Sequence, residues 1–433
     1  MNGTRGCRAA GATGSLSLML RNLRGTVLIA LSLLLAAGLA LAAKAPKAAP
    51  PPPALPRPTG MFTVGTTVAY LTDSTRTAGP PGAEFPRPIT VQLWYPTNDS
   101  TGAHESYLVE PGLAAAVVAS RYYQVDTTSL RAWGALTTGA LRDAHMATGA
   151  YRLVTLSHGL GNLRAGYTAF AVDLASHGIV VAAIDHPYGG LAVTPSGRVL
   201  AAGDDSTNWD DIPTHARRMD EWATDIRFVL DWLAGAPPGI AGAVSRGVDW
   251  RRVGAIGHSS GGLAAIQAAS RSDRIRVAID MDGGLVSPEG TPLAAFVREG
   301  FTRPTLIVKS HPVYSEADLK KRGKTQAQYD AAAKAAEAAL DSVPKGPTSP
   351  VFTASIAGTG HMSFSDAPFL MPTTITRFGG KVIEPERGYV VTSGVVMAFL
   401  DEYLRTGRVR PQTATALQTT LAQYPEVTLR QAR

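Results

Sequence analysis

A chain of 433 residues with 45% hydrophobic and 17% charged residues can bury a large core, which excludes an intrinsically disordered protein. The formal net charge of +7 falls to +3 when the four arginines of residues 1–43 are subtracted, so charge gives no motive for nucleic-acid binding. The single cysteine, Cys7, precedes the first apolar run. The chain after it can therefore contain no disulfide, thiol nucleophile or cysteine metal ligand.

The N-terminal segment has the layout of a signal peptide. Basic residues without any acidic residue precede an apolar run at 26–43, and residues 40–42 (Ala-Leu-Ala) offer a small-x-small cleavage site. We therefore expect residues 1–43 to be a signal peptide of a secreted or periplasmic protein, with Met19 as an alternative start. An uncleaved leader would instead anchor the protein in a membrane, although the run is at the lower limit for spanning a bilayer. The Ala- and Arg-rich composition behind a signal favours a bacterial exported protein.

Composition also divides the rest of the chain. Residues 44–59 are rich in Pro and Ala, cannot form a core and are expected to be a semi-rigid linker. We expect a catalytic domain at 60–410 and a C-terminal tail at 411–433.

The first part of this domain is rich in β-forming residues. The stretches 61–72 and 89–96 carry β-branched and aromatic residues bounded by Gly, Pro and Asp, which predicts a hairpin or edge strands. From Tyr151 onward, short apolar runs alternate with helix-length segments. The expected strands are 151–159, 179–187, 252–259, 276–282, 304–310 and 351–358, and the expected helices are 166–178, 219–235, 260–271 and 393–405. This alternation is typical of an α/β fold with a doubly wound, mostly parallel sheet flanked by helices.

Two further segments have more than one interpretation. The Ala-rich run 327–343 predicts a helix inserted between the last two expected strands, and residues 315–342 are either a lid over the site or a plain surface segment. The acidic stretch 203–211 is compatible with calcium binding. A solvated surface loop is favoured because the spacing of a known calcium loop is absent.

Ser259 is the candidate nucleophile. It is the serine of a Gly-x-Ser-x-Gly pattern, which a glycine-rich chain can show by chance. Here, however, the pattern lies between an expected strand and an expected helix, where a nucleophile elbow requires it. Gly257 and Gly261 would give room for the sharp turn.

A serine nucleophile needs a base and an acid, which in this kind of fold follow in the order Ser, Asp or Glu, His. His361 lies in a glycine-flanked loop after an expected strand and is the expected base, with His311 as the weaker alternative. Asp282 lies at the mouth of the strand 276–282 and is the expected acid. Asp280 is the alternative acid. Its structural interpretation is a buried carboxylate that is hydrogen-bonded to backbone donors.

The tetrahedral intermediate needs two hydrogen-bond donors. The backbone N–H of Ser260 follows the nucleophile directly, and the glycine loop 157–164 offers the N–H of Leu160. His158 of this loop is expected to be structural, because the loop acts through its backbone. No metal is expected, since the histidines include no His-Glu-x-x-His or other close pair.

The segments LSHGLGNLRAGYTAFAVDLASHGIVVAAIDH, GHSSGGLAAIQAA, AIDMDGG and GTGHMSFSD resemble the plasma-type platelet-activating factor acetylhydrolases and their bacterial relatives, near the dienelactone-hydrolase branch of the α/β-hydrolases. The resemblance runs in order from about residue 90 to residue 404. It implies an α/β-hydrolase fold, a triad of Ser259, Asp282 and His361, and oxyanion donors at Leu160 and Ser260. It further implies calcium-independent hydrolysis of esters with short or oxidised acyl chains.

We therefore expect a serine carboxylic-ester hydrolase that forms an acyl-enzyme and needs no cofactor. Its expected partner is a small-molecule or lipid ester. Contact with a lipid surface is left open, since residues 107–124 carry fewer aromatics than the family's lipid-facing segment. The alternatives are a lipase- or polyester-hydrolase-like enzyme acting on long chains or polymers, and a non-catalytic α/β-hydrolase-fold binding protein.

Overall fold

A large twisted sheet forms the centre of the computed structural model, which describes residues 54–80, 82–109, 127–201, 211–287, 290–371, 383–405 and 414–433. Eleven strands join in the order β13-β12-β11-β10-β9-β5-β6-β2-β1-β4-β3. Their bounds are β1 Thr63–Ala78, β2 Phe85–Thr97, β3 His104–Ser106, β4 Thr137–Arg142, β5 Tyr151–Ser157, β6 Ile179–Asp185, β9 Val248–His258, β10 Ile275–Met281, β11 Thr305–His311, β12 Val351–Ala357 and β13 Val427–Gln431. A separate small hairpin pairs β7 (Leu191–Val193) with β8 (Val199–Ala201).

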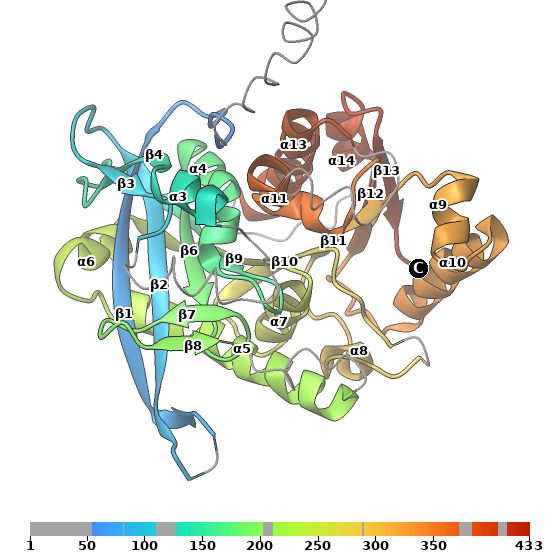
Figure 1. Ribbon diagram of the computed structural model, residues 1–433, viewed down its shortest axis with the longest axis horizontal. Helices are drawn as coiled ribbons and strands as arrows, with labels where there is room; N and C mark the ends of the chain where they lie inside the picture. The colour runs from blue at the N-terminus through green and yellow to red at the C-terminus, as the bar shows by residue number, and fades with distance from the viewer. Residues whose placement is uncertain are drawn as a thin grey trace, which may run out of the picture. The chain divides into compact units, whose positions relative to one another are not determined.

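The six central strands, β6, β5, β9, β10, β11 and β12, run parallel to one another. Each contains a stretch of buried, mostly apolar residues; all seven residues of β6, for example, are buried. Such uniformly apolar strands are stable only when both faces of the sheet are covered. The predicted doubly wound α/β fold is confirmed (Figure 1).

Helices cover both faces of the sheet (Figure 1). A hydrophobic core lies under each layer of helices. One layer contains α4 (Thr168–Ser176), α13 (Pro385–Leu404) and α14 (Ala414–Leu421). The other contains α5 (Ile212–Ala234), α6 (Gly239–Arg246), α7 (Ser260–Ser270) and α8 (Phe296–Glu299). The long helix α5 begins where the Asp211 side chain accepts the N–H of Thr214, and it buries the stripe that its sequence predicted, including Trp222 and Ile226.

The N-terminal β-rich part forms the expected hairpin, in which β1 and β2 pair antiparallel from Thr63↔Thr97 onward. The hairpin does not form the edge of the sheet, because the short strands β4 and β3 extend it further. The β4 sequence, TTGALR, has too little β-pattern to predict a strand.

The C-terminal segment expected as a tail adds α14 and the edge strand β13, which pairs antiparallel with β12. All the described residues fall in one compact unit. The Ala-rich run forms α10 (Gln326–Ser342) after the short α9 (Glu316–Lys321). Leu340 is the only buried residue of α10, so this helix lies on the surface.

Several expectations from the sequence concern segments outside the described residues. The leader 1–43, most of the linker, the acidic stretch up to residue 210 and the segment 110–126 belong to this group. Of the helices in the described part of the chain, none has both the length and the hydropathy that crossing a bilayer requires.

Candidate active site

The three candidate catalytic residues all lie at the carboxyl edge of the parallel sheet. Ser259 directly follows β9 and Asp282 directly follows β10, and these strands pair in register at His258↔Met281. His361 follows β12 and begins the short 3-10 helix η3 (His361–Phe364). Because the chain crosses over through helices, each parallel strand ends at the same edge, which is where α/β proteins bind their ligands.

Ser259 lies on a strained turn between β9 and α7. Its backbone has φ 54° and ψ −125°, a conformation that an L-residue other than glycine rarely adopts. Its N–H donates to the carbonyl of Met281 at 2.8 Å, which fixes the turn against β10. A Cβ on Gly257 would collide with the backbone of Gly261 and lie 2.6 Å from the N of Gly262, so glycine is required there. This is the geometry of a nucleophile elbow.

His361 and Asp282, the expected base and acid, are joined by a hydrogen bond. The Nδ1 of His361 lies 2.7 Å from Oδ2 of Asp282, and the histidine side chain is 47% exposed. Asp282 also accepts the N–H and the hydroxyl of Ser310, both at 2.8 Å. Burial alone raises the pKa of Asp282, but the hydrogen bonds from His361 and Ser310 outweigh it, and the pKa is lowered. The carboxylate therefore stays charged and can orient the imidazole.

Ser310 is a site residue that sequence reasoning missed. It lies near the end of β11, beside β10, and no motif marks it. A polar residue near the end of a central parallel strand was the only available signal. His311, the alternative base, is the last residue of the same strand, and its side chain is exposed. The Asp282 carboxylate is hydrogen-bonded to the other candidate base, His361.

Asp280, the alternative acid, lies deeper than Asp282 at the end of β10. It is fully buried, and its Oδ1 accepts the N–H of Gly283 at 2.8 Å. Its other carboxyl oxygen has no hydrogen-bond partner among the described residues. Burial raises the pKa of Asp280 to about 8, so the group is neutral at pH 7.

The glycine loop after β5 approaches the nucleophile closely. A Cβ on Gly159 would lie 3.3 Å from the Cβ of Ser259, which is tighter than ordinary packing. Among the hydrogen bonds of the described backbone, the N–H groups of Leu160 and Ser260 have no acceptor. The N–H of Ser260 is unpaired because it belongs to the first turn of α7, where no carbonyl of the helix precedes it.

His158 stabilises this loop. Its Nδ1 lies 2.7 Å from the carbonyl of Gly159, and its Nε2 accepts the N–H of His186 at 3.1 Å. Burial lowers the pKa of His158 to about 3, so the ring is neutral and carries its hydrogen on Nδ1. Both ring nitrogens are thus occupied by backbone groups.

A buried polar network lies behind the loop. Ser157, His186 and Asp225 follow one another at 3.1 and 3.0 Å, an order of groups that resembles a catalytic triad. All three are fully buried, and Trp222 stacks on the His186 ring with centroids 4.4 Å apart, so no substrate can reach them. Arg87 neutralises Asp225 through two hydrogen bonds of 2.8 Å. The network anchors the ends of β5 and β6 beneath the site.

The loop of His361 is fixed by Asp366. This buried carboxyl accepts the N–H groups of Thr168 and Ala169 at 3.0 and 3.2 Å, at the start of α4. Because a helix N-terminus has free N–H donors, it is a suitable partner for a carboxyl group. Burial raises the pKa of Asp366 to about 7. Asp366 lies five residues after His361 in the sequence, and it attaches the loop of His361 (the base loop) to α4.

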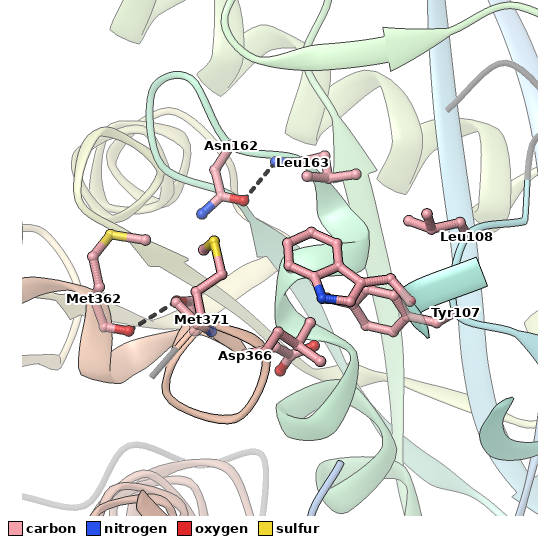
Figure 2. A pocket seen from close by; sticks show the side chains of 12 residues that line it. Tyr107, Leu108, Asn162, Leu163, Met362, Asp366 and Met371 are labelled. Carbon is pink, nitrogen blue, oxygen red and sulfur yellow. Dashed lines mark hydrogen bonds between the residues drawn. The ribbon is translucent and has the colours of Figure 1, made fainter. Parts of the chain in front are cut away.

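A small, mostly apolar cavity adjoins the glycine loop after β5 and the loop that contains His361 (Figure 2). Asn162 and Leu163 reach it from the glycine loop, and Met362 reaches it from the loop of His361. Its lining is Tyr107, Leu108, Trp133, Asn162, Leu163, Gly166, Met362, Ser365, Asp366, Ala367, Leu370 and Met371. Trp133 comes from α3 (Thr127–Gly134) and Leu370 from α11 (Ala367–Leu370). Such a lining suits an apolar group of a ligand.

No group of three or more His, Cys, Asp or Glu side chains that could hold a metal occurs in the described ranges. Of the acidic stretch considered for calcium, only Asp211 is described, and it caps α5.

The strand order and the elbow define an α/β hydrolase. A solved ferulic acid esterase from Streptomyces cinnamoneus superposes with a TM-score of 0.63 and 26% identity, over 87% of this chain and 99% of that one. The chain belongs to the family described as platelet-activating factor acetylhydrolase, isoform II, whose model matches residues 51–195 and 243–418. The resemblance to the platelet-activating factor acetylhydrolases that the sequence shows is thereby confirmed.

Individual relatives match at lower coverage. The platelet-activating factor acetylhydrolase of Canis lupus familiaris is 27% identical over 255 residues, which is 54% of each chain. That of Bos taurus is 28% identical over 254 residues, 51% of this chain and 56% of the relative. That of Gallus gallus is 24% identical over 293 residues, 60% of this chain and 63% of the relative. The matches thus span little more than half the length of these relatives.

Proposed function

We propose that the protein is a carboxylic-ester hydrolase that uses Ser259 as nucleophile, His361 as general base and then acid, and Asp282 to orient the imidazole. The observation that carries the proposal is the 2.7 Å hydrogen bond between His361 and Asp282 at the sheet edge where Ser259 occupies its strained turn. The names of the similar proteins, a ferulic acid esterase and platelet-activating factor acetylhydrolases, are those of ester hydrolases and support the same class.

We propose the following reaction for these residues. The hydroxyl oxygen of Ser259 attacks the ester carbonyl while Nε2 of His361 takes its proton, and Asp282 stabilises the resulting imidazolium. The negative charge of the tetrahedral intermediate lies against the N–H groups of Leu160 and Ser260. His361 then protonates the departing alcohol, which leaves an acyl group on Ser259. A water molecule, deprotonated by His361, hydrolyses this acyl-enzyme and restores the serine.

We infer that the substrate is a small-molecule or lipid ester with a short acyl chain. The support is the cavity beside the two catalytic loops, whose lining is mainly apolar and whose free space is small. A long chain would have no room there without displacement of side chains such as Leu163 or Leu370.

The test is hydrolysis of p-nitrophenyl esters from acetyl to long acyl chains by the protein and by its Ser259→Ala variant. We expect activity that is highest for short chains and absent from the variant. A long-chain optimum would favour the lipase- or polyester-hydrolase-like alternative. Equal inactivity of both proteins on every ester would favour the binding-protein alternative.

We also propose that residues 1–43 direct export and that residues 44–59 tether the hydrolase domain. The apolar run and the small residues at 40–42 support this proposal. Mass spectrometry of the protein recovered from outside the cytoplasm is the test, and a mature N-terminus close to residue 43 is the expected result. A full-length chain retained in the membrane would show that the leader is an anchor.

A further inference from the structure

A short chain of buried hydrogen bonds joins the three segments of the proposed catalytic site. The hydroxyl of Tyr167 lies 3.0 Å from the backbone N of Gly159 and 2.7 Å from Nδ1 of His258. The other ring nitrogen of His258, Nε2, lies 2.9 Å from the backbone carbonyl of His361. Tyr167 and His258 are both nearly inaccessible to solvent, at 0% and 1% exposure. The glycine loop, the elbow and the base loop therefore meet at these two side chains.

The partners fix the direction of every bond in this chain. The N–H of Gly159 and the side-chain amide of Asn162, 3.1 Å away, can only donate to the Tyr167 hydroxyl. The hydroxyl in turn donates its own proton to Nδ1 of His258. The carbonyl of His361 can only accept, so Nε2 of His258 carries the hydrogen. Burial and the neighbouring His361 lower the pKa of His258 to about 3, which keeps the ring neutral as this pattern requires.

Each end of this chain is one step from a proposed catalytic group. Gly159 precedes Leu160, whose N–H is the proposed oxyanion donor, and the carbonyl of His361 belongs to the base itself. His258 precedes Ser259, and its ring also packs against that of His361 with centroids 4.6 Å apart. A shift of any one segment must therefore strain or break a buried hydrogen bond. Losing a buried hydrogen bond costs more free energy than losing one whose groups can bond to water instead.

We propose that Tyr167 and His258 are positioning residues that hold the N–H of Leu160 and the imidazole of His361 in register with Ser259. This inference rests on the proposed function, because it assigns the two residues an effect on acyl transfer. Neither residue touches the substrate in this account. Tyr167 acts through Gly159 and His258, and His258 acts through His361.

Two substitutions each remove the hydrogen bond between the Tyr167 hydroxyl and Nδ1 of His258, one by deleting its donor and the other by deleting its acceptor. Tyr167→Phe removes the hydroxyl, and His258→Gln removes the Nδ1 acceptor while its amide can still donate to His361. Tyr95→Phe is the matched control, since Tyr95 is a fully buried tyrosine of β2 whose hydroxyl bonds one carbonyl, that of Ala144, at 2.8 Å. All three variants are compared with the unmodified protein by thermal unfolding and by hydrolysis of p-nitrophenyl acetate.

We expect kcat to fall about 10- to 100-fold in Tyr167→Phe and in His258→Gln, with KM within about threefold, because displaced catalytic groups slow the chemical step more than they weaken substrate binding. Affinity for an alkyl boronic acid, which forms a tetrahedral adduct with the serine, should fall in parallel with kcat. Tyr95→Phe also removes a buried hydroxyl and should lower thermal stability, but it should keep its kcat. The double variant should be no slower than the slower single variant, since both changes break one link.

Several outcomes would overturn the inference. An unchanged kcat in both single variants would show that the link does not position the site. Equal losses of kcat in Tyr95→Phe would show that general stability is responsible, and additive losses in the double variant would show two independent effects. Labelling of Ser259 by a fluorophosphonate separates this inference from the proposed function. If the unmodified protein is not labelled, both the proposed function and the positioning role fail. If it is labelled but Tyr167→Phe and His258→Gln keep their kcat, only the positioning role is refuted.

Discussion

Gly262→Ala is a substitution whose cost can be worked out from one contact. Gly262 lies in the first turn of α7, and a Cβ placed on it would overlap the Oδ1 atom of Asp280 and lie 2.6 Å from its Cγ. Ordinary carbon–carbon contacts are about 3.5–4.0 Å, so the carboxyl group would have to retreat by about 1 Å. That group is fully buried and bonded to the N–H of Gly283 at 2.8 Å, and it cannot retreat without stretching this bond.

The expected loss of stability follows from three effects. Overpacking of a core costs about 1–3 kcal/mol. A buried hydrogen-bonding group that loses its partner costs about 1–3 kcal/mol. Alanine is favoured over glycine in a helix by about 1 kcal/mol, which offsets part of the loss. We therefore expect Gly262→Ala to lower the free energy of unfolding by about 1–5 kcal/mol, with a midpoint of about 3 kcal/mol.

The same contact predicts a rescue. In an Asp280→Ala background the carboxyl group, which holds the two atoms nearest to the new Cβ, is gone, and the contact with the Cα of residue 280 at 3.0 Å remains. Gly262→Ala should then be within about 1 kcal/mol of neutral, which gives a coupling of about 3 kcal/mol between the two sites when the midpoint of the expected loss is used. Gly134→Ala is the control, because a Cβ there meets nothing within 4 Å.

This coupling is measured by urea unfolding at a pH near 6, where Asp280 carries its proton. The proteins compared are the unmodified protein, the two single variants, the double variant and the control. If Gly262→Ala costs the same in both backgrounds within about 0.5 kcal/mol, the packing of Asp280 against α7 is wrong.

Three further predictions concern the site and its surroundings. Burial raises the pKa of Asp280 to about 8, so its contribution to stability is complete below the unfolded-state pKa near 4 and is lost as the pH rises to 8. Asp280→Asn should thus become more stable relative to the unmodified protein across this range, by at most about 1.4 kcal/mol per pH unit, and a constant difference in urea titrations would contradict this. Ser310→Ala removes the hydroxyl donor to Asp282 and should lower kcat about tenfold with KM little changed; full activity would show that the backbone N–H suffices. Leu370→Ala enlarges the cavity and should move the p-nitrophenyl ester optimum to longer chains by roughly one to three carbons, whereas an unchanged optimum would place the acyl chain elsewhere.

The fold, and the sheet edge at which the candidate site residues lie, could be predicted from the sequence for one physical reason. Parallel strands read as short apolar runs between helical segments, so their carboxyl ends can be located along the chain. Ser259, Asp282 and His361 each follow such an end, and the topology brings these ends to one edge. Asp282 could be preferred over Asp280 because the last residue of the run reaches the mouth of the strand, while Asp280 stays buried within it.

The supporting contacts could not be predicted in the same way. Ser310 bonds Asp282 only because β10 and β11 pair, and Tyr167 bonds His258 across 91 residues of sequence. Neither pair has a spacing or composition that distinguishes it from ordinary core residues. The strands β4 and β13 were missed for a related reason, since short edge strands depend on a neighbour to pair with more than on their own pattern.

The most direct test of the account is to identify the nucleophile chemically. The protein is treated with a fluorophosphonate, digested and analysed by mass spectrometry, beside Ser259→Ala and His361→Gln variants. The account predicts a single phosphonyl adduct on the peptide that contains Ser259, no adduct in Ser259→Ala and much slower labelling in His361→Gln, because the hydroxyl then lacks its base. An unlabelled protein, or an adduct on another serine, would contradict the account.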